Sequence, residues 1–149
     1  LNEVRVGTKV PSQMADLELK IDGRVIGRDL VDAVLVATTV GASAYTLSAG
    51  GAVVDPRLRA MVIVPVCPLS SNFKPYVVPS DTRVSLRQLR RPPVTVMVDG
   101  QYQKRVSSGV AVEIEASSRS IVFLRTGPDF YTRLRRRLST TSLSPASQA

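Results

Sequence analysis

The stretch from Asp32 to Gly51 contains residue types that suit the binding of a polar ligand. It opens with an acid and the apolar run 34–37, and small residues, hydroxyls, one tyrosine and a pair of glycines follow. Residues without bulk let a backbone come close to a ligand, and Ser43, Tyr45 and Ser48 offer hydroxyls beside it. Because the same composition also suits a plain turn between two strands, it leaves a turn and a ligand loop as alternatives.

Other residue types restrict the chemistry that the chain could perform. The sequence has no histidine, which removes the commonest general base, so its single cysteine, Cys67, lacks a histidine to activate it. The sequence shows neither a metal-ligating cluster nor a phosphate-binding P-loop. Any reaction would therefore be phosphoryl transfer, which depends on positioning and electrostatics. We predict that Cys67 is a small packing residue near a ligand or a subunit interface.

The composition is that of one globular domain with a strong positive charge. The chain has 149 residues, 44% of them hydrophobic, and a net charge of +8. This charge allows an anionic partner but does not choose between a nucleotide, a nucleic acid and a lipid headgroup. The single cysteine suits a reducing cytosol, and the sequence has neither a signal peptide nor an apolar run of membrane-spanning length. We therefore expect a cytoplasmic protein without membrane contact.

Hydrophobic alternation and turn residues predict a protein made mainly of β-strands. Apolar residues alternate with charged ones at 17–21, and the Asp-Gly pairs at 22–23 and 99–100 are strong hairpin turns. We predict roughly ten short strands, which lie at 4–6, 17–21, from 25, 34–37, 60–66, 76–78, 84–86, 94–98, near 102, 110–114 and 121–124. Strands and helices do not alternate, so the pattern favours an all-β, two-layer β-sandwich. The charges of the first hairpin are expected to face water.

A helix is predicted near the end of the chain. Residues 126–129 read T-G-P-D and supply a capping hydroxyl, an early proline and an acid. Phe130, Leu134 and Leu138 then lie on one face, and arginines occupy the others, which makes the helix amphipathic. We expect one domain at 1–138 and a flexible tail at 139–149, since the tail has no core-forming pattern.

The central stretch is similar to a known loop. Residues 38–45 read T-T-V-G-A-S-A-Y and residues 47–51 read L-S-A-G-G. They resemble the threonine- and glycine-rich loop of the NAD kinase family, which usually reads T-P-T-G-S-T-A-Y and then S-x-S-A-G-G. Further family motifs match in the family's order between residue 2 and about residue 138: Asn2-Glu3, Asp32, 53–56, 64–68, 75–79, 98–101 and 130–134.

The resemblance implies a fold, a reaction and a set of binding residues. The second domain of NAD kinases is an all-β sandwich. In these enzymes ATP or polyphosphate, with Mg²⁺, phosphorylates the 2′-hydroxyl of the adenosine ribose of NAD to give NADP. The implied roles here are adenine binding by Asn2, ribose binding by Glu3, contact with the nicotinamide amide by Asp32, and adenosine binding by Ser43, Ala44, Tyr45 and Ser48.

The resemblance also implies that NAD binds at a subunit interface. Cys67 and Leu69 would then come from a neighbouring copy, and Asp99-Gly100-Gln101 would approach the phosphate-accepting side. The apolar run 60–66, together with the strands bounded by prolines, favours burial of a sheet edge or face against a second copy. We therefore predict a homodimer or a tetramer, with NAD and NADP as ligands and without nucleic acid.

Some family positions are altered in this sequence. Thr39 replaces the usual proline, Val40 and Ala42 replace hydroxyl residues, Ala33 replaces a glycine and Leu69 replaces a histidine. Since two hydroxyls are missing from the loop, we expect fewer side-chain bonds to the ligand. These changes bear on affinity and substrate preference more than on the fold.

The family's catalytic acid belongs to a G-G-D-G motif in a preceding domain, and this sequence has no G-G-D-G. We therefore expect a fragment or a truncated product, with no catalytic residue of its own and no kinase activity alone. Two alternatives stay open. A domain of the wider lipid-kinase superfamily is opposed by Asn2-Glu3 and Tyr45. A basic β-module that binds nucleic acid is opposed by the scarcity of aromatic residues for base stacking.

Overall fold

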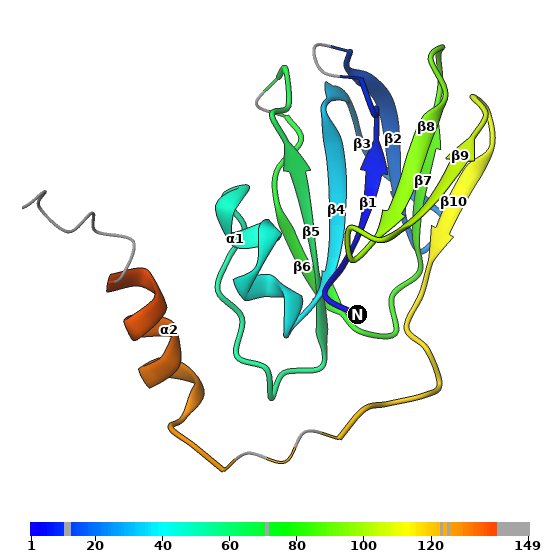
Figure 1. The fold of residues 1–149 in the computed structure, drawn as a ribbon. Helices are drawn as coiled ribbons and strands as arrows, with labels where there is room; N and C mark the ends of the chain where they lie inside the picture. The colour runs from blue at the N-terminus through cyan, green and yellow to red at the C-terminus, as the bar shows by residue number, and fades with distance from the viewer. Residues whose placement is uncertain (11–12, 71, 123, 125, 140–149) are drawn as a thin grey trace, which may run out of the picture. The chain divides into compact units, whose positions relative to one another are not determined.

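The computed structural model describes residues 1–10, 13–70, 72–122, 124 and 126–139. Residues 1–118 form one compact unit, in which two antiparallel sheets face each other (Figure 1). The predicted all-β, two-layer sandwich is therefore confirmed. The large sheet has the order β6-β5-β4-β1-β8-β9, with bounds β1 (Glu3–Gly7), β4 (Ala33–Thr38), β5 (Ala60–Val66), β6 (Tyr76–Pro79), β8 (Val94–Val98) and β9 (Tyr102–Val106).

The small sheet closes the other side of the sandwich. Its order is β10-β7-β2-β3, with bounds β2 (Ala15–Ile21), β3 (Arg24–Val31), β7 (Val84–Gln88) and β10 (Ala111–Ile114). Alternate residues of both sheets point into the core between them, because successive side chains of a strand lie on opposite faces. Its buried members include Val6, Leu17, Leu19, Val34, Val36, Ile63, Phe73, Val84 and Leu86.

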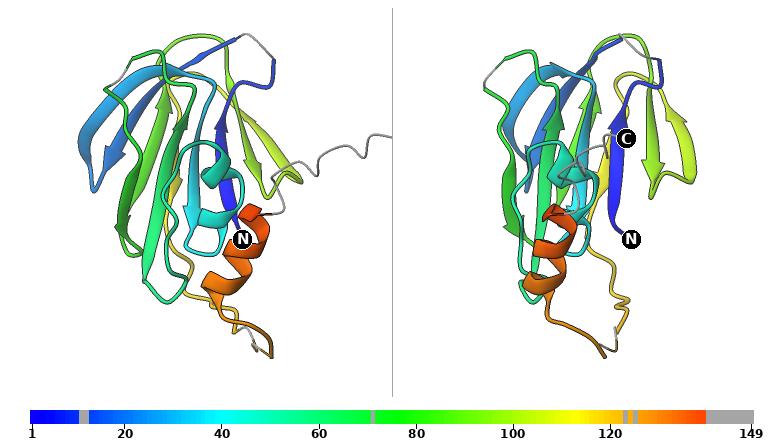
Figure 2. Two further views of the ribbon diagram at one scale, coloured as in Figure 1. Left: turned by 90° about the vertical axis from the view of Figure 1, so that its left-hand side faces the viewer. Right: turned by 60° about the vertical axis from the view of Figure 1, so that its left-hand side comes forward.

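A second core covers the outer face of the large sheet. The segment after β4 forms a short 3-10 helix, η1 (Gly41–Ser43), and one turn of helix, α1 (Tyr45–Ser48). Figure 2 shows this segment outside the sandwich, where η1 contacts β4 and α1 contacts β5. Ala42 and Val54 of this segment pack on Leu35, Val62 and Val64. This layer explains why β4 and β5 are apolar on both faces.

The second core corrects one expectation. The apolar run 60–66 was expected to bury a face against another copy of the chain. It is β5, where Met61 and Ile63 belong to the inner core and Val62 and Val64 to the outer core. The burial of this run is therefore accounted for within one chain.

Two hairpins close as predicted, on Asp-Gly pairs. Asp22 and Asp99 have φ values of 48° and 47°, and Gly23 and Gly100 have φ values of 79° and 71°. Positive φ at both central residues is the geometry of the type I′ turn that suits the twist of paired strands. The first of these turns joins β2 to β3, and the second joins β8 to β9.

The charges of the first hairpin are less exposed than expected. Asp16 on β2 is 5% exposed, and its carboxylate accepts two hydrogen bonds from Arg28, of 2.8 and 2.7 Å. Arg90 lies 3.1 Å from the same carboxylate. The hydrogen bonds from Arg28 hold the pKa of Asp16 below its ordinary value, although burial opposes them. Asp16 thus ties β2 to β3 and to the connection after β7.

Residues 119–149 form a separate unit, and one predicted strand in it is wrong. Ile121, Val122 and Leu124 are 74%, 84% and 92% exposed and belong to no strand. An apolar run becomes a strand only where another strand pairs with its backbone groups. None of the ladders in the described part of the chain includes these residues.

The predicted terminal helix is confirmed as α2 (Phe130–Ser139). Its first turn is capped by Asp129, whose carboxylate accepts the N–H of Thr132 at 3.0 Å, rather than by the expected hydroxyl of Thr126. Ser139, which was expected to begin the tail, ends this helix, and the rest of the predicted tail lies outside the described residues. No helix of the described ranges is long and apolar enough to cross a membrane.

Candidate functional site

The residues before β1 meet the end of β4 at one end of the large sheet. The carbonyl oxygen of Asn2 accepts a hydrogen bond of 3.0 Å from the N–H of Thr38. The Thr38 hydroxyl donates a hydrogen bond of 3.0 Å to the carbonyl of Leu1. The next turn of chain packs closely on this point, because a Cβ built on Gly41 would lie 2.0 Å from the Asn2 oxygen. Only glycine allows this approach of two backbones. The loop and the Asn2-Glu3 pair are therefore neighbours, although Glu3 and Gly41 are 38 positions apart in the sequence.

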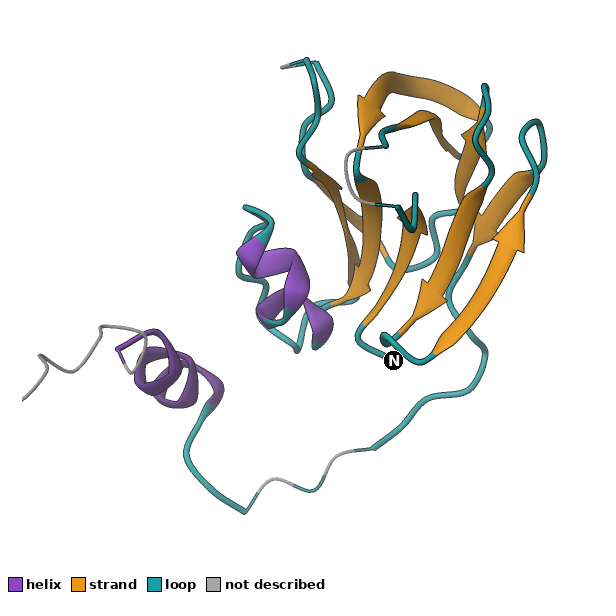
Figure 3. Cartoon of the chain, turned by 45° about the horizontal axis from the view of Figure 1, so that its top comes forward, coloured by secondary structure: helices purple, strands orange, loops and turns teal. Residues whose placement is uncertain are grey.

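The turn between β8 and β9 lies at the same end of the sheet. The Oδ1 atom of Asp99 accepts the N–H of Asn2 at 2.7 Å and the N–H of Glu3 at 3.1 Å. The N–H of Asp99 donates to the carbonyl of Glu3 at 3.1 Å. These bonds place the turn beside the start of β1 (Figure 3). Gly100 and Gln101 of the turn are exposed.

Glu3 carries a buried oxygen that lacks a partner. Its Oε2 atom is shielded from solvent and accepts no hydrogen bond from the residues that the structure describes. Burial raises the pKa of the Glu3 carboxyl, and the nearby charge of Asp99 raises it further. A buried acceptor without a donor is costly, so such atoms mark places where a ligand or water completes the bonding.

The central stretch is folded into short helices rather than an extended loop. The hydroxyl of Thr46 is fully buried and donates to the carbonyl of Gly41 at 2.9 Å, which ties η1 to α1. Ser43 donates its hydroxyl to the Val40 carbonyl at 3.2 Å. Tyr45 is 44% exposed at the start of α1. The predicted ligand residues Ala44 and Ser48 are partly buried and exposed, respectively.

The altered family positions fall in different environments. Ala42 is fully buried in the second core, where a hydroxyl would need a partner among apolar side chains. Thr39 is also buried, whereas Val40 is 44% exposed. The replacement at Ala42 therefore alters the packing of the outer core, whereas within the loop the replacement at Val40 changes an exposed group.

The structure does not bring Asp32, Cys67 and Leu69 to this end of the sheet. Asp32 precedes β4 and donates its N–H to the carbonyl of Val66 at 3.0 Å, next to the exposed Cys67. Leu69, 68% exposed, donates its N–H to the carbonyl of Leu30 at 2.9 Å. The six residues of β4 lie between the two groups, and at about 3.3 Å per residue they span about 20 Å. The predicted site residues thus form two groups at opposite ends of one strand.

Sequence reasoning missed three contributors to the first group. It did not anticipate the hydrogen bonds of Thr38, the buried hydroxyl of Thr46 or the use of the Asp99 carboxylate by Asn2 and Glu3. A threonine at a strand end and an aspartate in a two-residue turn are signals that such groups need partners. The identity of those partners depends on strand order, which the sequence pattern leaves open.

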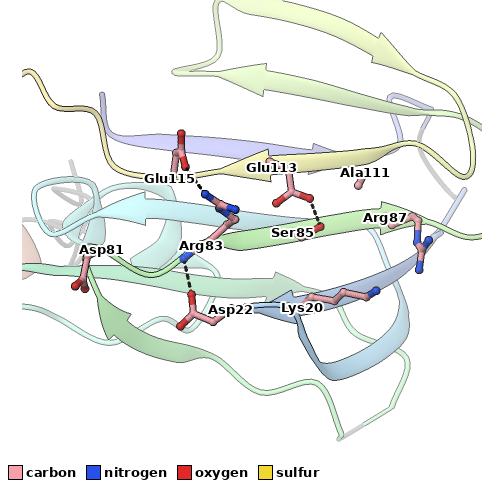
Figure 4. Close-up of a pocket in the computed structure, with 10 residues that line it drawn as sticks. Lys20, Asp22, Asp81, Arg83, Ser85, Arg87, Ala111, Glu113 and Glu115 are labelled. Carbon is pink, nitrogen blue, oxygen red and sulfur yellow. Dashed lines mark hydrogen bonds and ion pairs between the residues drawn. The ribbon is translucent and has the colours of Figure 1, made fainter.

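A hollow of about 710 Å³ lies elsewhere, on the outer face of the small sheet (Figure 4). Its three cations are each paired with a carboxylate: Lys20 and Arg87 with Glu18, and Arg83 with Glu115. The strands that line this hollow are β2, β7 and β10. The Asn2 group and the Asp32 group lie on or next to other strands. This surface is a network of paired charges rather than part of the candidate site.

Comparison with known proteins identifies the relatives of this arrangement. The family model described as the ATP-NAD kinase C-terminal domain matches residues 1–126. The chain is 35% identical to the NAD kinase of Methanothermobacter thermautotrophicus over 139 residues, which are 93% of this chain and 49% of that protein. It is 34% identical to the NAD kinase of Pyrococcus abyssi over 138 residues, or 93% of this chain and 50% of that protein. The chain spans about half the length of the curated relatives it matches.

Solved structures show the same similarity. The crystal structure of an NAD kinase from Archaeoglobus fulgidus in complex with ATP superimposes with a TM-score of 0.79 at 31% identity, over 93% of this chain and 52% of that one. Yeast NADH kinase complexed with NADH gives a TM-score of 0.82 at 24% identity, over 99% of this chain and 46% of that one. The second similarity concerns the fold alone.

Proposed function

This chain belongs to the NAD kinase family as the C-terminal domain of such an enzyme, and we propose that it supplies the NAD-binding half of the kinase. In this proposal the domain holds NAD while the 2′-hydroxyl of its adenosine ribose accepts a phosphate, which gives NADP. The donor is ATP or polyphosphate. The domain's contribution is to fix the position of the accepting hydroxyl, since positioning is a main component of enzymatic phosphoryl transfer.

The observation that carries this proposal is the unpartnered Oε2 of Glu3. A ribose presents hydroxyl groups, each of which can donate a hydrogen bond to a carboxylate. Such a bond satisfies the buried oxygen and favours the ionised form of a carboxyl whose pKa is raised in its absence. Glu3 therefore has the chemistry to hold a sugar next to the backbone of the loop.

The remaining contacts of this half of the ligand follow from the same end of the sheet. Asn2 binds the adenine, and Ser43, Ala44 and Tyr45 hold the adenosine, with Ser48 beside them. The hydroxyl of Ser43 donates to Val40, so its oxygen keeps a lone pair for the ligand. Tyr45 leaves part of its side chain exposed, as a residue that covers a bound ligand requires.

The separation of the two groups leads us to include a second copy of the chain. Asp32, with Cys67 and Leu69, lies about 20 Å along β4 from the Asn2 group. We propose that Asp32 of a neighbouring copy meets the nicotinamide amide of the NAD held by Asn2 and Glu3. The protein would then act as a homodimer or a tetramer, with each dinucleotide bound between two copies.

The donor phosphates and Mg²⁺ have no evident place among these residues. The described residues contain no group of three or more His, Cys, Asp or Glu side chains that could hold a metal ion. We propose that these ligands belong to the half of the enzyme that the relatives have beyond the region matched here. In this division the present domain binds the acceptor NAD.

Calorimetry of NAD binding to the chain tests the site. Asn2→Ala and Tyr45→Ala should each weaken binding by about 1–3 kcal/mol, because each leaves a ligand group without its partner. Asn72→Ala changes an exposed asparagine that is not among the proposed site residues, so binding should not change in this control. Unchanged affinity in both Asn2→Ala and Tyr45→Ala would refute the site assignment.

A further inference from the structure

We propose that Asp99 is a positioning residue for dinucleotide binding, which acts by holding the backbone of Asn2 and Glu3. This inference rests on the function proposed above, because it concerns how the two ligand residues are presented. Asp99 stands 97 residues from Asn2 in the sequence, and its carboxylate accepts both of their N–H groups. The role assigned here is an indirect one, through the backbone, without contact between Asp99 and NAD.

The ladder between β1 and β8 ends next to the segment that the Asp99 carboxylate bonds. Val4 on β1 pairs with Val98 on β8, which is the last residue pair of this ladder. Beyond it, the N–H of Asp99 still donates to the Glu3 carbonyl. The N–H groups of Asn2 and Glu3 are bonded to the Asp99 side chain instead of a neighbouring backbone. The Asp99 side chain therefore fixes the backbone of Asn2 and Glu3, the residues proposed to bind the ligand, where the ladder has ended.

The geometry of the turn leaves the carboxylate available for this task. The turn is closed by its own backbone, since the N–H of Gln101 donates to the carbonyl of Val98 at 3.0 Å. Asp99 and Gly100 have the positive φ values of a type I′ turn. Neither feature uses the Asp99 carboxylate, so the turn can form while that group bonds to β1.

Asn2 is held from its other side as well. Its carbonyl oxygen accepts the N–H of Thr38 at 3.0 Å, so both backbone polar groups of Asn2 are bonded. The loop thereby fixes Asn2 on one side, and the Asp99 turn fixes it on the other. Asn2 is exposed, so its position depends on these hydrogen bonds, whereas the position of a buried core residue is fixed by packing. Loss of the Asp99 bonds should release the Asn2-Glu3 segment while the sandwich stays folded.

The chain contains a matched control for this arrangement. Asp22 lies in the other Asp-Gly turn with nearly the same φ, and its carboxylate accepts the N–H of Arg83, before β7, at 2.9 Å. The two turns thus make the same kind of bond to the start of a strand. Only the bond from Asp99 reaches residues of the proposed NAD site. Asp22→Ala therefore measures the structural effect alone.

The experiment compares Asp99→Ala, Asp99→Asn and Asp22→Ala with the unaltered chain. Amide hydrogen exchange by NMR, without NAD, reports the Glu3 N–H directly, and calorimetry reports NAD affinity. In Asp99→Ala, exchange at Glu3 should become roughly ten- to hundredfold faster and NAD affinity should fall by a similar factor, as expected for hydrogen bonds to a charged group. Asp99→Asn keeps an accepting oxygen and should restore most of both quantities. Asp22→Ala should leave NAD affinity unchanged.

Three outcomes would overturn the proposal: Glu3 exchange that is unaltered in Asp99→Ala, NAD affinity that is unaltered in that variant, or an equal loss of affinity in Asp22→Ala. Failure of the proposed function gives a different result, because the unaltered chain then does not bind NAD although its Glu3 amide is protected. In that case the role in NAD binding is refuted together with the function. Hydrogen exchange still decides whether Asp99 holds Glu3.

Discussion

Gly41 and Asn2 lie so close together that a Cβ built on Gly41 would be 2.0 Å from the Asn2 carbonyl oxygen. A methyl group cannot fit at this distance, and the three nearest atoms, the O, C and Cα of Asn2, all belong to the backbone and cannot rotate away. We predict that Gly41→Ala lowers the free energy of unfolding by about 3 kcal/mol, the upper part of the range for overpacking. Denaturation by urea measures this value. NAD binding should weaken with it, since Asn2 must move.

Gly27→Ala is the matched control for this change. Gly27 lies in β3, where a Cβ would find its nearest neighbour, an atom of Phe73, at 4.0 Å. The substitution should alter stability by no more than about 0.5 kcal/mol. If Gly41→Ala were as stable as Gly27→Ala, the close contact between the loop and Asn2 would be wrong.

The stability of the domain should depend on pH through Asp16. Hydrogen bonds from Arg28 lower the pKa of Asp16 in the folded chain below its ordinary value of 3.8. The ionised form therefore stabilises the fold fully above pH 3.8, and this contribution disappears as the pH falls through the lower folded pKa. We predict that Asp16→Asn lowers the free energy of unfolding at pH 7 by about 1–3 kcal/mol.

Chemical denaturation between pH 7 and pH 2 tests this prediction. The stability difference between the unaltered chain and Asp16→Asn should shrink below pH 4 and be nearly constant above it. Asp81→Asn, at an exposed position, should show no such difference. A difference that stays constant throughout the acid range would mean that ionised Asp16 does not contribute as described.

Mixing of two variants tests binding of NAD between copies. Asn2→Ala removes one end of the proposed site, and Asp32→Ala removes the other. In a mixed dimer, one of the two sites combines the intact Asn2 of the Asp32→Ala chain with the intact Asp32 of the Asn2→Ala chain. A dimer of either variant alone has no site with both ends intact. Random mixing should therefore restore tight NAD binding at about a quarter of the sites. Sedimentation shows whether the chain assembles. A chain that stays monomeric at high micromolar concentration, or mixed dimers that recover no binding, would exclude the shared site.

The isolated chain should lack kinase activity. The printed sequence has no G-G-D-G motif, and phosphoryl transfer to a hydroxyl needs a cradle for the donor phosphates and a carboxylate that takes the proton. We predict no NADP formation from NAD, ATP and Mg²⁺ by the 149 residues alone, and turnover once a domain with the G-G-D-G acid is added. If the isolated chain matched the completed protein, the base would lie within it, and Asp32 would be the first candidate.

Local patterns predicted most of the sandwich. The alternation at 17–21 and the two Asp-Gly turns depend on neighbours in the sequence, and the structure has the corresponding hairpins. The run at 121–124 misled the prediction because it has strand-like residues but no strand to pair with. The buried charge of Asp16 was missed for a related reason. Its partner Arg28 lies on β3, and Arg90 lies beyond β7.

The sequence named residues for the candidate site but could not give their geometry. Asn2, Glu3 and the loop at 41–48 were singled out by resemblance, and the structure brings them together. The role of Asp99 depends on the pairing of β1 with β8, which no local pattern reveals. The position of Asp32 at the opposite end of β4 follows from the direction of that strand, so a set of motif residues need not form one site within one chain.

The bond between Asn2 and Asp99 also has a consequence for the making of the protein. The two residues are 97 positions apart, so Asn2 is translated about 5–20 s before Asp99 at ordinary rates of synthesis. During that interval β4 can pair with β1, but the edge that β8 later occupies is open. In the proposed function, the Asn2-Glu3 part of the NAD site can therefore take its final form only after β8 and the Asp99 turn have been translated.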